Sequence, residues 1–322
     1  MRRGLVGLSV AIVLLTLVVV PLPLVELQPG PALDVASLIN FGGPAHPVSG
    51  QLLLTTVTLS RPSAFGALEA LLAHRDLLPE GRVIPPGVDE RQYLEAQKAN
   101  FNESLDIAAA VGLKAAGFPV SVSGGGVEVT GIIKASPAES KIDVGDVIQA
   151  VDGRPVQLAS EVQASTESAT AGQLVTLTIL RGSQQLQVQV RLRRLDQIGR
   201  PGLGVVLRTL APKVSLRFPI TVRNQNIGGP SAGLMMALTV YELASGTDLA
   251  RGRTVAGTGT IDISGSVGPV GGVAEKILGA KRAGAVLFLA SRSEVDQARS
   301  ARTGIPVVPV STFDEAVAAL RQ

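Results

Sequence analysis

The sequence has 322 residues, with 29 Lys or Arg against 26 Asp or Glu, so its formal net charge is only +3. Aromatic residues make up 3% and no basic run occurs, which argues against a nucleic-acid groove. The absence of cysteine excludes disulfides, thiol catalysis and cysteine-based metal sites, and the length suffices for two domains beyond a membrane anchor.

An uncharged, largely apolar run follows Arg2 and Arg3 and extends from Gly4 to Val25. As a helix it would be about 33 Å long, against a hydrocarbon core of about 30 Å. The basic residues before it favour a cytoplasmic N-terminus, with everything after Glu26 outside the cytoplasm. A cleaved signal peptide is the alternative, but Pro21–Glu26 lacks an A-x-A-like site. We therefore expect residues 1–25 to form an uncleaved transmembrane signal-anchor in the cell membrane.

Residues 26–115 are expected to form an extracytoplasmic linker and a helical segment. Proline, glycine and polar residues from Gln28 to Pro47 are typical of a linker. A strand at 51–59 and helices at 65–72 and 91–115 follow, the last with an interruption near 100–102. No His/Asp/Glu cluster with metal-ligand spacing occurs in the sequence, so we expect neither a metal nor another cofactor.

Residues 116–196 change to short strands separated by glycine turns. The segment Ser136–Val156 reads SPAESKIDVGDVIQAVDGRPV, in an order that resembles PDZ domains. This resemblance implies a domain that binds an extended peptide by adding a strand to a sheet edge, with backbone N–H groups receiving the terminal carboxylate. The expected receiving loop precedes the first strand and comprises Gly124, Gly125, Gly126 and Val127, although three glycines also suit a flexible turn.

Residues 197–322 form the last expected domain, with strands at 203–209 and 214–222 leading to the sequence Gly228-Gly-Pro-Ser231. Glycine, glycine and proline make a tight turn, so Ser231 lies where a buried, apolar helix at 232–243 begins. The unpaired N–H groups of a helix N-terminus favour an oxyanion, which makes Ser231 a candidate nucleophile.

A nucleophilic serine needs a base, and the two histidines, His46 and His74, lie far upstream of Ser231. Lys276 is the better candidate. It lies on a predicted helix at 273–283, where its neighbours on the same face are Gly, Val and Ala residues. Such residues can desolvate the ammonium and lower its pKa until the neutral amine accepts the serine proton.

The sequences GGPSAG at 228–233 and TGTIDISGSVGPVGGVAEK at 258–276 resemble the proteolytic domain of Lon-type Ser-Lys proteases, specifically membrane-anchored, PDZ-containing bacterial members. The resemblance implies that Ser231 is the nucleophile, that Lys276 is the general base and that Thr258 supports the lysine by hydrogen bonding. It also implies an α+β domain of the ribosomal protein S5 domain 2-like fold, with helices against a mixed sheet, and a homo-oligomeric ring.

The sequence therefore predicts a membrane-anchored serine endopeptidase that cleaves unfolded or PDZ-delivered proteins outside the cytoplasm. It lacks a Gly-x-x-x-x-Gly-Lys-Ser/Thr motif, so we expect no ATP hydrolysis by this polypeptide. The alternative is a non-catalytic PDZ scaffold with an inert Lon-like domain. A trypsin-like PDZ protease is excluded, because its catalytic domain would precede the PDZ domain and contain a Gly-Asn-Ser-Gly-Gly motif.

Overall fold

The computed structural model describes residues 18–72, 75, 77–84, 90–167, 169–195, 200–210, 213–223 and 227–322. Most of the predicted anchor, residues 1–17, lies outside these ranges, as does the domain boundary expected at 196/197. Within the described ranges, no helix combines the length and the apolar character that crossing a bilayer requires. Leu24 and Val25 begin strand β1 (Leu24–Asp34), so the expectation of one helix through Val25 is wrong at its C-terminal end. Pro21 and Pro23 explain this, because proline does not continue a helix.

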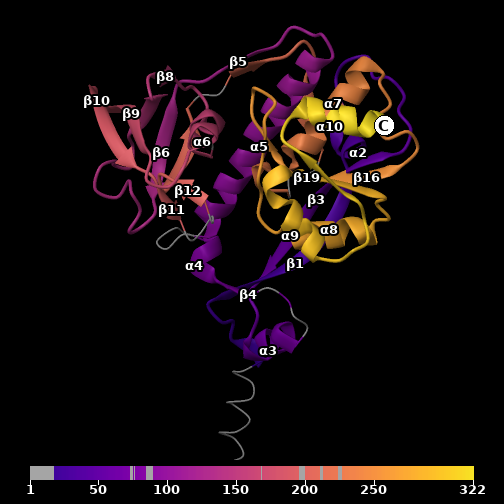
Figure 1. The fold of residues 1–322 in the computed structure, drawn as a ribbon, viewed down its shortest axis with the longest axis horizontal. Coiled ribbons are helices and arrows are strands. Elements are labelled where there is room, and N and C mark those ends of the chain that lie inside the picture. The colour runs from indigo at the N-terminus through magenta and orange to yellow at the C-terminus, as the bar shows by residue number, and fades with distance from the viewer. Residues whose placement is uncertain are drawn as a thin grey trace, which may run out of the picture.

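A six-stranded mixed sheet forms the centre of the larger domain (Figure 1). Its strands, in spatial order, are β20 (Val307–Val310), β19 (Leu287–Ser291), β16 (Thr254–Gly257), β3 (Gln51–Ser60), β1 and β4 (Leu77–Pro79). The first four run parallel to one another, whereas β1 and β4 are each antiparallel to the preceding strand. Helices against a mixed sheet agree with the fold class expected from the sequence.

Different helices cover the two faces of this sheet. Leu52 and Leu54 share a hydrophobic cluster with α5 (Glu90–Ala115), α7 (Gly233–Ser245) and α10 (Phe313–Arg321). Leu53 belongs to a second cluster with α8 (Val273–Arg282) and α9 (Val295–Ser300). Since successive side chains of a strand point to opposite faces, a sheet covered on both sides requires an unbroken apolar run such as Leu52–Leu54.

The expected linker at 26–115 is part of this domain. Proline and glycine in 28–47 suggested irregular chain, yet β1 pairs with β3 along most of its length, and α2 (Val35–Leu38) and β2 (Ile39–Phe41) follow it. Tertiary pairing with β3 overrides the weak local propensity. Helix α5 continues through the expected interruption at 100–102, because Phe101 is buried against the core.

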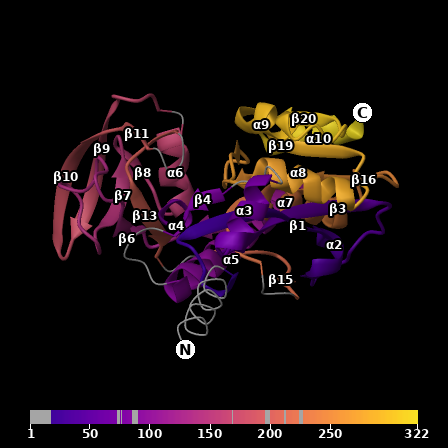
Figure 2. The same ribbon diagram turned by 90° about the horizontal axis from the view of Figure 1, so that it is seen from below.

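The smaller domain is inserted between α5 and α7. β5 (Ser121–Ser123) leads into it, β14 (Lys213–Ser215) leads out of it, and these two strands pair antiparallel. Its antiparallel sheet has the order β10 (Gln184–Arg191), β9 (Leu174–Arg181), β7 (Val147–Val151), β6 (Val127–Ile132) and β13 (Val205–Thr209), and β8 (Arg154–Pro155) pairs with β7. The strand expected at 203–209 therefore completes the smaller domain instead of opening the last one. Figures 1 and 2 show α5 between the two domains.

The remaining elements are short connections, apart from two helices that matter below, α3 (Ala64–Leu72) and α6 (Ala159–Glu167). The short ones are α4 (Glu80–Val83), β11 (Arg193–Leu195), β12 (Arg200–Gly202), β15 (Ile220–Val222), η1 (Pro230–Ala232), β17 (Thr260–Ile261), β18 (Val267–Gly268) and η2 (Arg292–Glu294).

Helices α5 and α7 approach each other closely at Gly112. A Cβ added there would lie 2.6 Å from the carbonyl oxygen of Ala237, a contact that the backbone can relieve only by moving. We expect Gly112→Ala to lower the free energy of unfolding by about 2 kcal/mol, because overpacking outweighs the better helix propensity of alanine. Chemical denaturation followed by circular dichroism measures this. Lys114→Ala, on the exposed side of α5, should stay within about 0.5 kcal/mol of wild type; equal stability of both variants would contradict the close approach.

Candidate active site

Ser231 lies in a tight turn that precedes the buried helix α7. Gly229 has φ +80°, a left-handed value that favours glycine, and turns the chain into the 3₁₀ helix η1, which contains Pro230 and Ser231. Helix α7 itself begins two residues later, at Gly233, and is buried from there to Ala244. Ser231 is half-buried. The turn therefore holds Ser231 next to the positive end of the α7 dipole, as the Gly-Gly-Pro sequence predicted.

Helix α5 supports the turn that carries Ser231 through two hydrogen bonds. The carbonyl of Gln97 accepts the N–H of Gly229 at 2.8 Å, and the hydroxyl of Ser104 donates to the carbonyl of Pro230 at 3.1 Å. Both contacts come from a region in which the sequence shows no catalytic motif. No local signal could have identified Gln97 and Ser104, because their partners are more than a hundred residues away in the chain.

Thr258 follows the last residue of β16 and lies beside the Ser231 turn. Its hydroxyl donates to the backbone carbonyl of Ser231 at 3.1 Å, and the N–H of Gly259 donates to the same carbonyl at 3.0 Å. Its own N–H donates to the carbonyl of Leu289 on β19. Thr258 is fully buried. These bonds join the end of the central strand to the beginning of α7.

Lys276 lies in α8, on the opposite face of the sheet from α7, and its side chain is 3% exposed. Burial lowers the pKa of its ammonium from 10.5 to about 8, although the negative charges of Glu294 and Glu275 oppose the shift. Nζ donates to Thr258 Oγ1 at 3.2 Å. Burial thus lowers the pKa of Lys276, as the sequence predicted, and the two carboxylates make this shift smaller. The sequence did not reveal that Glu294 lies close enough to Lys276 to influence its pKa.

The structure brings the three predicted residues together at the carboxyl end of β16. The hydrogen bond of Lys276 Nζ goes to Thr258 and not to the hydroxyl of Ser231, so the lysine and the serine are connected through Thr258. A buried amine of lowered pKa beside a serine at a helix start can carry out acyl transfer, with the amine taking the proton of the hydroxyl.

The predicted carboxylate loop, Gly124–Val127, does not lie at an open sheet edge. The N–H of Gly124 donates to the side chain of Gln157, and that of Gly125 donates to the carbonyl of Leu210. Val127 begins β6, which has β7 on one side and β13 on the other. The loop therefore lacks the free strand that a peptide would extend. Local glycine content could not reveal this, because β13 comes from the far end of the domain.

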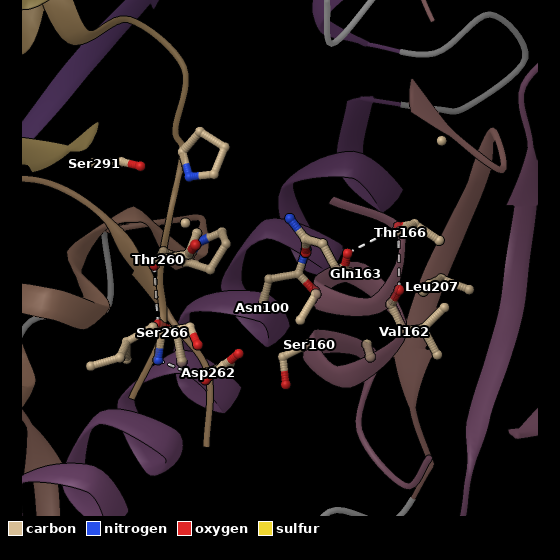
Figure 3. Close-up of a pocket in the computed structure, with 18 of the residues that line it drawn as sticks. Asn100, Ser160, Val162, Gln163, Thr166, Leu207, Thr260, Asp262, Ser266 and Ser291 are labelled. Carbon is tan, nitrogen blue, oxygen red and sulfur yellow. Dashed lines mark hydrogen bonds between the residues drawn. The ribbon is translucent and has the colours of Figure 1, made fainter. Parts of the chain in front are cut away.

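A cleft of about 960 Å³ separates the inserted domain from the site. Figure 3 shows Thr260, Asp262, Ser266 and Ser291 of the larger domain on one wall, and Ser160, Val162, Gln163 and Thr166 of α6 with Leu207 of β13 on the other. Asn100 of α5 lies between the walls. Pro230, the residue before Ser231, also lines the cleft. The candidate nucleophile is thus next to a space bounded by both domains.

Two protein families match this chain. A PDZ domain family matches residues 115–192, and the Lon protease (S16) C-terminal proteolytic domain matches residues 222–321. The second match includes Ser231, Thr258 and Lys276. The first ends before β13, the strand that completes the sheet of the inserted domain.

Curated relatives are bacterial and mitochondrial Lon proteases. Lon protease 2 of Bacillus subtilis is 28% identical over 190 residues, which cover 55% of this chain and 34% of that protein. Lon protease 1 of Sorangium cellulosum is 38% identical over 94 residues, which cover 28% of this chain and 11% of that protein. The chain therefore spans about a third or less of the length of these two relatives.

Among solved structures, the PDZ domain of the SdrC-like protein from Listeria monocytogenes is 28% identical, with 26% of this chain and 86% of that chain covered and a TM-score of 0.25. The family matches and the Lon relatives, taken with the site, identify the two parts: the chain carries a PDZ domain and a Lon C-terminal proteolytic domain, and it is homologous to bacterial Lon proteases.

Proposed function

We propose that this protein is a serine endopeptidase in which Lys276 activates Ser231. Homology to the Lon proteolytic domain supports a peptidase of the serine type. The observation that carries the specific assignment is the buried Lys276 amine, with its pKa lowered to about 8, hydrogen-bonded to a threonine that also binds the backbone of Ser231.

The proposed reaction begins when Ser231 Oγ attacks the carbonyl carbon of a peptide bond and its proton passes to Lys276 Nζ. The tetrahedral intermediate collapses, the proton moves from Nζ to the leaving amine, and an acyl-enzyme remains. Lys276 then takes a proton from water, which attacks the ester carbonyl. The second tetrahedral intermediate collapses and releases the acid, and the proton passes from Nζ to the departing Ser231 Oγ, which restores the hydroxyl and the neutral amine. Thr258 orients the amine throughout. For the first step, a small movement of the Lys276 side chain must bring Nζ to the hydroxyl, a shift that substrate binding commonly produces.

The proposed substrates are unfolded or flexible proteins, cleaved without ATP hydrolysis by this chain, which contains no Walker A sequence. The cleft beside Ser231 supports delivery by the PDZ domain. β13 is the edge strand of that domain within the described residues, and α6 lies beside it. We propose that a peptide extends the sheet along β13, against Val162 of α6, with its terminal carboxylate at residues 202–204.

We also propose that the chain is anchored in the cell membrane by its N-terminal segment, with both domains outside the cytoplasm. The support is the sequence alone: Arg2 and Arg3 precede a run without charges that is long enough to span a bilayer. A homo-oligomeric ring is proposed from the resemblance to Lon proteases, and light scattering on the detergent-solubilised chain tests it.

A serine-reactive fluorophosphonate tests the assignment of the site. We expect mass spectrometry to find the label on Ser231, and we expect the labelling rate to rise with pH. Only the neutral Lys276 amine can accept the proton, and with a pKa of about 8 roughly a tenth of it is neutral at pH 7. The rate should therefore increase almost tenfold per pH unit below 8 and level off above it.

Lys276→Met is the control for this experiment, since it should remove the rise with pH. Labelling of another serine, or a rate independent of pH from 6 to 9.5, would contradict the assignment. A chain that binds peptides but is never labelled would be the non-catalytic scaffold.

A further inference from the structure

Helix α5 also touches the PDZ domain, through Glu103. The hydroxyl of Thr209, on β13, donates to Glu103 Oε1 at 2.7 Å. The same hydroxyl accepts the N–H of Ala159, the first residue of α6, at 2.9 Å. Burial raises the pKa of the Glu103 carboxyl, while the hydrogen bond from Thr209 opposes the rise. One short chain of hydrogen bonds thus connects α5 with both elements that border the proposed peptide groove.

The residue next to Glu103 in α5 makes the contact with the catalytic turn. Ser104 is buried and donates to the carbonyl of Pro230, and about two helical turns earlier in α5 the carbonyl of Gln97 accepts the N–H of Gly229. Consecutive residues of a helix point about 100° apart, so Glu103 and Ser104 reach different domains from one place. The turn that carries Ser231 and the edge strand β13 of the PDZ domain therefore both form hydrogen bonds with the segment 97–104 of α5.

Helix α5 is suited to transmit a displacement between these contacts. It has 26 residues and buries Phe101, Leu105 and Ala108 in the core of the larger domain. The close contact of Gly112 with Ala237 fixes it against α7. A tightly packed helix moves as a unit, so a shift of Glu103 moves Ser104 with it.

We propose that occupancy of the groove between α6 and β13 is communicated to the Ser231 turn through α5, with Glu103 and Ser104 as positioning residues. A peptide that extends β13 fixes Thr209 and the start of α6, and through Glu103 it fixes the segment Gln97–Ser104 and the turn. This inference deepens the proposed peptidase function by giving it a regulator. Coupling is reciprocal, so an acylated Ser231 also raises the affinity of the groove for peptide.

Hydrogen exchange of the full chain tests this coupling without requiring catalysis. The probe is a ten-residue peptide that ends in valine with a free carboxylate, and its amidated form is the control. We expect the free-carboxylate peptide at saturation to slow exchange of the amides at 228–234 about fivefold or more in wild type. The amidated peptide should leave them unchanged.

The variants assign the effect to Glu103. Glu103→Ala should bind the peptide and lose its effect on 228–234, whereas Glu103→Gln, which keeps an acceptor for Thr209, should retain the effect. Thr209→Val removes the same hydrogen bond from the other side, and Asn102→Ala on exposed α5 surface is the matched control that retains the effect.

The coupling is overturned if wild type shows no change at 228–234 with peptide bound, if no peptide binds, or if Glu103→Ala and Thr209→Val both keep the full effect. Failure of the peptidase function looks different: exchange still responds to the peptide, but Ser231 is neither labelled nor required for cleavage.

A second observation concerns the surface of α3. This nine-residue helix exposes Phe65, Leu68, Leu71 and Leu72, with Leu72 75% exposed, which is unusual for large apolar side chains in one short helix. Residues near the C-terminal end of the N-terminal apolar run are bonded to the start of α3: Pro21 forms a β-bridge with Ser63, and the N–H of Leu22 donates to the carbonyl of Pro62.

We infer that this face of α3 rests on the lipid surface of the membrane in which the N-terminal run is anchored. The inference depends on the proposed anchor. Bonds at residues 21 and 22 hold α3 close to the C-terminal end of the run, so an anchored run brings α3 to the boundary between headgroups and acyl chains. Apolar side chains of an interfacial helix are stable at that depth.

The absence of native cysteine allows a direct test. Leu68→Cys and Val286→Cys, both at positions 53% exposed, are labelled with a polarity-sensitive fluorophore in the full chain and reconstituted in phosphatidylcholine and phosphatidylglycerol vesicles. We expect doxyl-labelled lipids to quench the label at position 68 at least threefold more than the label at 286. Equal, weak quenching with the chain bound to vesicles overturns the contact but leaves the anchor; a chain that does not float with vesicles overturns both.

Discussion

Ser231→Ala is expected to reduce cleavage of a permanently unfolded protein by about 10³-fold or more. The alanine keeps the turn made by Gly229 and Pro230 and loses only the atom that would form the acyl bond. Loss of a nucleophile that acts with its base costs several orders of magnitude in serine hydrolases. Initial rates of cleavage by the purified full chain, wild type against variant, measure the effect.

Two controls separate loss of chemistry from loss of structure. Ser300→Ala changes an exposed serine of α9 whose hydroxyl bonds only locally, to the carbonyl of Gln297, and should cleave at the wild-type rate. The melting temperature of Ser231→Ala should match that of wild type, because alanine keeps the backbone hydrogen bonds of a residue that is only half-buried. Undiminished cleavage by Ser231→Ala would end the proposed mechanism.

Lys276→Met should abolish cleavage to a similar extent while making the protein more stable. Methionine has nearly the same length and volume as lysine, so it fills the same buried space without an amine to accept the serine proton. The double variant with Ser231→Ala should be no slower than either single variant, because two groups that act as a unit do not contribute additively.

The stability gain follows from the lowered pKa of Lys276. The amine titrates near pH 10.5 when unfolded and near pH 8 when folded, so between these values the unfolded chain binds more protons and stability rises with pH. Below pH 8 both states are protonated and the full cost of the buried charge, about 3 kcal/mol, is present. Lys276→Met should therefore be up to about 3 kcal/mol more stable at pH 7, and this difference should shrink towards pH 10.5.

Thermal unfolding of wild type and of Lys276→Met from pH 6 to pH 10 measures the difference in stability between them. A variant that is inactive and strongly destabilised at pH 7 would make Lys276 a structural residue. An inactive and stabilised variant is the signature of a charge kept for chemistry at the expense of stability.

Local patterns in the sequence predicted the parts of the molecule well. The short strands expected within 116–196 include β9, whose side chains alternate between buried and partly exposed positions, because a sheet with one face in water requires a period of two. The Gly-Gly-Pro sequence predicted a sharp turn before a buried helix, because the backbone needs glycine at a left-handed φ and proline suits the first helical position.

Predictions that depended on long-range pairing were the ones that needed correction. The segment at 28–47 looked like a linker, and its ordering comes from β3 of the same sheet. The strand at 203–209 looked like the start of the catalytic domain, and it pairs instead with β6 of the PDZ domain. In both cases the segment's own residues are compatible with several states, and the partner strand selects one.

The sequence by itself determined which residues could do chemistry, since a serine in a glycine-proline turn and a lysine among small neighbours are recognisable from their immediate surroundings. Only the tertiary structure decided that they meet. Ser231 belongs to the layer of helices on one face of the sheet and Lys276 to the layer on the other, and Thr258 at the end of β16 joins them. That meeting point, and the helix α5 that supports it, arise from burying both faces of one sheet, which no stretch of the chain encodes alone.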